Sequence, residues 1–72
     1  MKQKKYRVYV IDSNGVQSTR EFYTYEGALD CAETFAKLSE ENKVDAISVK
    51  IMGIETKHIL YSNIKKIDVK IK

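Results

Sequence analysis

The sequence predicts an α+β domain in which a single antiparallel sheet of four to five strands carries one helix across one face. Three observations lead to this prediction: a strong hairpin signal near the N-terminus, one segment with the 3.6-residue period of a helix, and alternating apolar residues after that segment. The predicted element order is β-β-α-β-β-β. Strands grouped on either side of one helix favour an antiparallel sheet, because parallel sheets require strands and helices that alternate.

The N-terminal hairpin is the clearest local signal in the chain. Two segments rich in β-forming residues, 6–11 and 16–23, flank an Asp-Ser-Asn-Gly tetrapeptide at residues 12–15. This tetrapeptide fits a type I turn followed by a left-handed glycine, which together make a three-residue hairpin loop. The loop fixes the register, which is expected to pair Val10 with Ser18, Tyr9 with Thr19, Val8 with Arg20, Arg7 with Glu21, and Tyr6 with Phe22.

The middle of the chain predicts a helix over residues 25–41. Thr24 is the expected N-cap, and Asn42 is the expected residue just beyond the C-terminal end. One stripe of this helix is apolar or small and is expected to face the sheet: Tyr25, Ala28, Leu29, Ala32, Phe35, Ala36 and Ser39.

Three strands are predicted after the helix. Residues 44–52 alternate in hydropathy, residues 57–62 form a shorter strand, and Ser62-Asn63 is expected to turn the chain into a third strand at 67–71. Whether residues 57–71 form two strands or one bent strand stays open. The predicted core consists of Phe22, Leu29, Ala32, Phe35, Ile47, Val49, Ile51, Val69 and Ile71.

Length and composition predict one domain, residues 1–72, with a basic tail at residues 1–5. No segment has the apolar length of a signal peptide or a membrane span, so we expect a cytoplasmic protein. The net charge of +3 is modestly basic. A sequence rich in Lys, Ile and Tyr, without Pro or Trp, is typical of AT-rich coding sequences such as those of low-GC bacteria and their phages.

The sequence indicates a protein that is not an enzyme and that uses no cofactor or metal. The one histidine, His58, and the one cysteine, Cys31, lack the partners that a catalytic dyad or a metal site requires. The acidic residues Glu26, Asp30 and Glu33 are interpreted as a solvated helix face, because paired catalytic carboxylates require a cleft.

A candidate interaction surface lies on the sheet face opposite the predicted helix. Aromatic, branched and arginine side chains are common at the centre of protein interfaces, which suggests a protein-binding regulator or inhibitor. The partner would be another protein or a second copy of the chain. The alternative is that tyrosines merely tolerate a half-wet sheet face. The residues expected on this surface are Arg7, Tyr9, Ile11, Tyr23 and Lys50.

A second hypothesis is single-stranded nucleic-acid binding. Here Tyr9 would stack on bases while Lys66 and Lys70 neutralise phosphates. The same lysines could instead protect an edge strand against aggregation, which is a common use of lysine in β-sheets.

Overall fold

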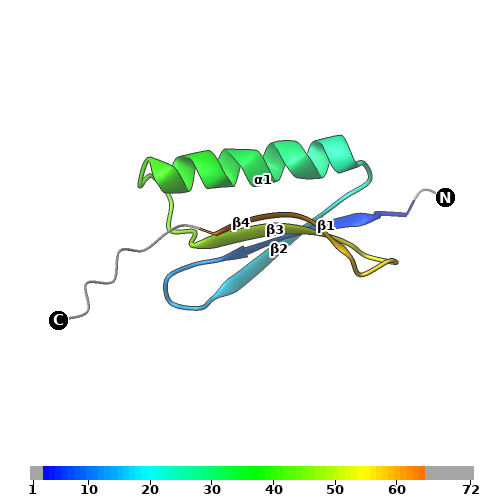
Figure 1. Ribbon diagram of the computed structural model, residues 1–72, viewed down its shortest axis with the longest axis horizontal. Helices are drawn as coiled ribbons and strands as arrows, with labels where there is room; N and C mark the ends of the chain where they lie inside the picture. The colour runs from blue at the N-terminus through cyan, green and yellow to red at the C-terminus, as the bar shows by residue number, and fades with distance from the viewer. Residues whose placement is uncertain (1–2, 65–72) are drawn as a thin grey trace.

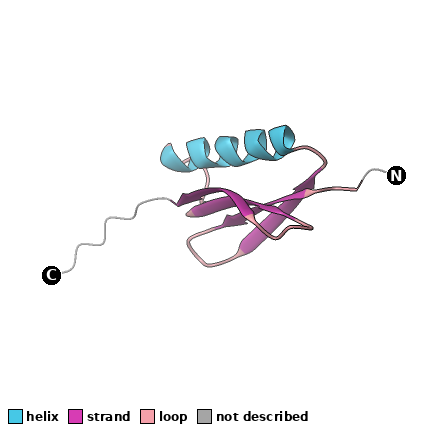
Figure 2. Ribbon diagram, turned by 45° about the vertical axis from the view of Figure 1, so that its right-hand side comes forward, coloured by secondary structure: helices cyan, strands magenta, loops and turns pink. Residues whose placement is uncertain are grey.

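The computed structural model describes residues 3–64, which form one four-stranded antiparallel sheet with a single helix packed against one face (Figure 1). The strand order is β2-β1-β3-β4, so that the N-terminal hairpin and the later strand pair meet between β1 and β3. Figure 2 shows the two layers, with the helix on one side of the sheet. The α+β class predicted from the sequence is confirmed. The elements are β1 (Tyr6–Ile11), β2 (Gln17–Phe22), α1 (Tyr25–Glu40), β3 (Ser48–Gly53) and β4 (Ile59–Ile64).

The β1–β2 hairpin has the turn and the register that its sequence predicts. Gly15 adopts a φ of 82°, and its N–H donates to the carbonyl of Asp12 at 3.0 Å. The Asp12 carboxylate also accepts from the backbone N–H groups of Asn14 and Val16, both at 2.9 Å. Every predicted pair, from Val10 with Ser18 to Tyr6 with Phe22, is present.

The helix α1 begins and ends at the predicted signals. The Thr24 hydroxyl accepts from the Gly27 N–H at 3.1 Å, as an N-cap does. The helix ends at Glu40, and Asn42 follows with a φ of 58°, the left-handed conformation in which helices commonly end.

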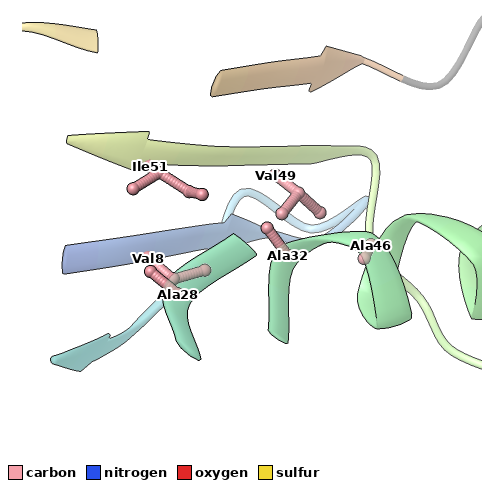
Figure 3. Packing of buried hydrophobic residues seen from close by; sticks show 6 residues of the cluster. All are labelled: Val8, Ala28, Ala32, Ala46, Val49 and Ile51. Atoms are coloured by element: carbon pink, nitrogen blue, oxygen red, sulfur yellow. The ribbon is translucent and has the colours of Figure 1, made fainter. Parts of the chain in front are cut away.

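The core lies between α1 and the two central strands (Figure 3). Val8 from β1, with Val49 and Ile51 from β3, is buried against the small side chains of Ala28 and Ala32. Alanines at these helix positions allow α1 to approach the sheet closely. Burying each of these larger side chains stabilises the fold by about 1.5–3 kcal/mol.

Four predicted core residues are half-buried rather than buried: Phe22, Leu29, Phe35 and Ile47. Phe35 is half-buried because it lies toward β2, where the guanidinium of Arg20 is 5.8 Å from the centre of its ring. Ile47 is also half-buried, in the connection before β3. The predicted core residues Val69 and Ile71 lie outside the described part of the chain.

The strand predicted over residues 44–52 is shorter in the structure. β3 begins at Ser48, because residues 44–47 bring the chain down from the end of α1 to the sheet. Side-chain hydrogen bonds hold this connection: the Ser39 hydroxyl donates to the Ala46 carbonyl, and the Ser13 hydroxyl donates to Asp45 at 2.7 Å. Alternating hydropathy alone therefore overestimated the strand.

The turn predicted at Ser62-Asn63 is wrong. Both residues lie in β4, opposite Lys50 and Val49, and a β-bulge near Leu60 interrupts the pairing with β3. The chain instead turns just after β3, in a segment that includes Lys57 at a φ of 58°. The further strand predicted at 67–71 lies outside the described residues.

Candidate functional site

The sheet face opposite α1 has no second layer in the part of the chain that the structure describes (Figure 2). Val8, Val49 and Ile51 point toward α1, so the alternate residues of each strand point the other way. We call this surface the open face. By strand alternation and register it consists of Arg7, Tyr9, Ile11, Gln17, Thr19, Glu21, Ser48, Lys50, Met52, Ile59, Ser62 and Ile64.

Tyr9 lies near the middle of the open face, on a strand that has a neighbour on each side. Its ring is half-buried and is flanked by two cations. The Lys50 ammonium is 5.4 Å from the ring centre, and the Arg7 guanidinium is 5.9 Å from it. At these distances each cation is attracted to the electron-rich face of the ring. The strand pairing holds this arrangement, because Lys50 lies directly opposite Tyr9 in the register.

Arg7 connects Tyr9 to the neighbouring strand. Its guanidinium donates to the Tyr9 hydroxyl at 3.2 Å and twice to one carboxylate oxygen of Glu21, at 2.6 Å and 3.0 Å. The bonds to Tyr9 and Glu21 raise the pKa of Arg7 above its already high ordinary value. The side chain therefore keeps its charge and has three of its donors occupied.

Tyr23 lies apart from this group, just beyond the end of β2. Its side chain is 52% exposed, and the ammonium of Lys4 is 5.7 Å from the centre of its ring. Along β2, Glu21 lies between Tyr23 and Thr19, the residue opposite Tyr9. The Arg7–Glu21 ion pair thus separates the two tyrosines, and the open face is not a continuous apolar patch.

The structure brings together three of the five predicted surface residues. Arg7, Tyr9 and Lys50 form one contact group, which we call the Tyr9 cluster. Ile11 is half-buried at the far end of β1, opposite Ser48. Of the residues proposed for nucleic-acid binding, the structure describes only Tyr9; Lys66 and Lys70 lie outside residues 3–64.

Eight residues of the open face were not assigned to it from the sequence: Gln17, Thr19, Glu21, Ser48, Met52, Ile59, Ser62 and Ile64. Glu21 was placed opposite Arg7 but was not assigned to the surface, although a carboxylate facing arginine across two strands signals an ion pair. Met52 lies two residues after Lys50 on β3, so strand alternation could have assigned it. Ile59 and Ile64 could not be assigned, because the pairing of β4 follows from no local turn motif.

The titratable residues give few options for chemistry. Among the described residues no three His, Cys, Asp or Glu side chains converge into a group that could hold a metal ion. Cys31 is half-buried on α1, and burial raises the pKa of its thiol, which disfavours the reactive thiolate. His58 is exposed beside the start of β4.

No described helix combines the length and the apolar character needed to cross a membrane. A scan against protein-family models and searches of curated proteins and of solved structures found no match for the chain. The geometry of the open face is therefore the basis for assigning a function.

Proposed function

We propose that the protein is a non-enzymatic binding module that docks its open face onto another protein. The observation that supports this most strongly is the position of Tyr9, half-buried near the middle of an uncovered sheet face with a cation beside its ring. Tyrosine and arginine are enriched among the residues that dominate binding energy in protein interfaces. The role would be that of a small regulator or inhibitor, of the kind encoded by phages or mobile elements.

The Tyr9 cluster suggests the chemistry of the partner. Arg7 is already paired with Glu21, whereas Lys50 belongs to neither of the ion pairs found among residues 3–64. A matching surface would offer an apolar recess for the Tyr9 ring and a carboxylate for Lys50. Docking would also remove water from the Arg7–Glu21 ion pair. Its two internal hydrogen bonds, and the one from Arg7 to Tyr9, help to offset this desolvation cost.

The proposal is tested by comparing Tyr9→Ala with Val16→Ala. Val16 is an exposed control, being 58% exposed and lying outside the open face, beside Val8 and Val10. A partner captured from the cognate cell lysate would be purified and its affinity measured for each folded variant. Tyr9→Ala is expected to weaken binding about 30-fold or more, which corresponds to about 2 kcal/mol, and Val16→Ala to leave it unchanged. Equal affinities for the parent and Tyr9→Ala would contradict the proposal.

Single-stranded nucleic-acid binding is the second candidate, and the same cluster supports it. An aromatic ring flanked by cations on a sheet can stack on a base while the cations neutralise phosphates. This hypothesis requires affinity for a labelled oligonucleotide that falls steeply with salt. Fluorescence polarisation at two salt concentrations decides the question: salt-sensitive binding lost in Tyr9→Ala and in a Lys66→Gln, Lys70→Gln variant would replace the protein-binding proposal.

A further inference from the structure

The two edge strands of the sheet differ in charge. β2 carries Arg20 and Glu21, whereas β4 carries no residue that is charged at neutral pH. Charged side chains on edge strands commonly prevent pairing with another sheet, so β2 has this protection and β4 lacks it. The β4 edge also exposes large apolar side chains, with Ile64 70% and Leu60 45% exposed.

The direction of the backbone groups in β3 follows from two hydrogen bonds at its end. The N–H of Ile54 donates to the carbonyl of Lys5 at 2.9 Å, on the β1 side. The N–H of Gly53 donates to the carbonyl of His58 at 3.0 Å, on the β4 side. Because backbone groups alternate along a strand, the odd-numbered residues of β3 direct their N–H and C=O groups toward β4.

The same alternation gives the direction of the backbone N–H and C=O groups of β4. Tyr61 and Asn63 lie opposite odd-numbered residues of β3 and therefore use their backbone groups inside the sheet. Ser62 and Ile64 consequently direct their N–H and C=O groups to the outer edge. This part of β4 is regular, since the bulge lies on the N-terminal side of Tyr61.

We propose that β4 pairs antiparallel with β4 of a second copy of the chain, about a two-fold axis at Ser62. In this register the outward N–H and C=O groups of Ser62 pair with those of Ser62 in the second copy, and Ile64 lies beside the bulge at Leu60 of the second copy. Tyr61 faces Asn63 of the second copy, and both project from the α1 side of the sheet, so these two side chains meet on the same face. A two-fold axis makes every such contact occur twice.

The resulting dimer has one eight-stranded sheet, with both helices on one face and the two open faces continuous on the other. Uncharged strands allow this self-pairing, because no like charges meet at the axis. The dimer contact is independent of the proposed function, since it uses the edge of β4 and not the Tyr9 cluster.

Cysteine cross-linking tests the register, because a residue on the two-fold axis lies beside the same residue of the second copy. Ser62→Cys would be compared with Ser18→Cys on the opposite edge strand, each in a Cys31→Ser background. Residues paired in this way have Cα atoms about 5.5 Å apart, within the range of a disulfide. Under mild oxidation Ser62→Cys is expected to form disulfide-linked dimers at least about tenfold faster than Ser18→Cys. The dimer would hold the two thiols at position 62 side by side, whereas thiols at position 18 would meet only by diffusion. Equal rates would overturn the proposal.

Sedimentation velocity tests the contact without cross-linking. Ile64→Lys is matched by Val16→Lys, which adds the same charge at another exposed apolar residue. Ile64→Lys is expected to raise the dimer dissociation constant about tenfold or more, while Val16→Lys leaves it near the parent value.

Three further results would overturn the β4 dimer. Sedimentation could show a monomer up to about 1 mM or a dimer insensitive to Ile64→Lys, and hydrogen exchange could show slow exchange of the Ser62 amide in the monomer. The last result would mean that the chain covers its own edge. Tyr9→Ala is expected to leave the disulfide cross-linking of Ser62→Cys unchanged. The β4 dimer and the docking of the open face are therefore tested independently of each other.

Discussion

The guanidinium of Arg20 on β2 lies 5.8 Å from the centre of the Phe35 ring on α1. This contact closes the side of the core that α1 leaves open, because the helix packs mainly over β1 and β3. The phenylalanine of the helix stripe is consequently at the margin of the core. Ile51, in contrast, is fully buried at its centre.

Ile51→Ala is therefore expected to destabilise the protein more than Phe35→Ala. Truncating a fully buried isoleucine costs about 2–5 kcal/mol. Loss of the half-exposed Phe35 ring should cost about 1–2 kcal/mol, since it removes less buried area and one cation–π contact. Urea unfolding measures both, and Ile51→Val, with an expected cost of about 0.5–1.5 kcal/mol, is the substitute if Ile51→Ala does not fold. Equal losses for Ile51→Ala and Phe35→Ala would contradict this assignment of the core.

Thr24→Ala is expected to destabilise the protein by about 1 kcal/mol, because the Gly27 N–H loses its acceptor at the first turn of α1. Thr34→Ala is the matched control. Thr34 is exposed in the middle of the helix, and its hydroxyl donates to the Asp30 carbonyl at 2.8 Å. Thr34→Ala loses this hydrogen bond but gains the higher helix propensity of alanine. The substitution should therefore change the free energy of unfolding by less than about 0.5 kcal/mol. Equal effects in thermal unfolding would exclude the capping role.

Gly15→Ala is expected to cost about 1–2 kcal/mol, because a side chain disfavours the left-handed conformation at a φ of 82°. A Cβ at Gly15 would meet no neighbour within 4 Å, so the cost would come from the backbone alone. Gly15→Asn should recover part of this loss, since asparagine tolerates the left-handed region better. If Ala and Asn cost the same, backbone strain does not explain the preference for glycine.

Burial raises the pKa of the Cys31 thiol, and the positive charge of Arg20 partly opposes this effect. The rate of Cys31 alkylation should therefore rise at a higher pH in the folded protein than in the unfolded chain in urea. Arg20→Gln should move the profile of the folded protein further upward. An Arg20→Gln profile at lower pH would contradict the assigned cause.

The same shift predicts the sign of a pH effect on stability. At pH values between the pKa of Cys31 in the unfolded state and its higher pKa in the folded state, the thiol keeps its proton only in the folded state. The free energy of unfolding should thus fall as pH rises through this window, and the fall should be smaller in Cys31→Ser. An identical pH dependence in both proteins would show that Cys31 does not contribute.

Local signals explain which elements could be predicted from the sequence. The turn ending at Gly15 fixed every pair of the β1–β2 hairpin, and Thr24 and Asn42 marked the ends of α1. The turn before β4 includes Lys57 in a left-handed conformation, which lysine rarely adopts, so that turn carried no recognisable motif. Ser62-Asn63 has turn-forming composition but lies in β4, where cross-strand pairing overrides local preference.

The hairpin register made one part of the candidate site predictable. That register placed Arg7 and Tyr9 on one face and set Glu21 opposite Arg7. The contact between Lys50 and Tyr9 depends on the pairing of β1 with β3, which are far apart in the sequence and joined through α1. No local rule sets the register of such a long-range pair, so its details required the structure.

The central claim, that the open face contacts a partner, is tested most directly by site-specific photo-cross-linking. Benzoylphenylalanine would replace Thr19, which lies opposite Tyr9 on the open face, or Thr34, which is also exposed but lies on α1. The predicted result is a cross-linked partner from position 19 and none from position 34, with the product lost when Tyr9→Ala is added. Cross-linking of the partner from position 34 alone would contradict the claim and would identify α1 as the binding surface.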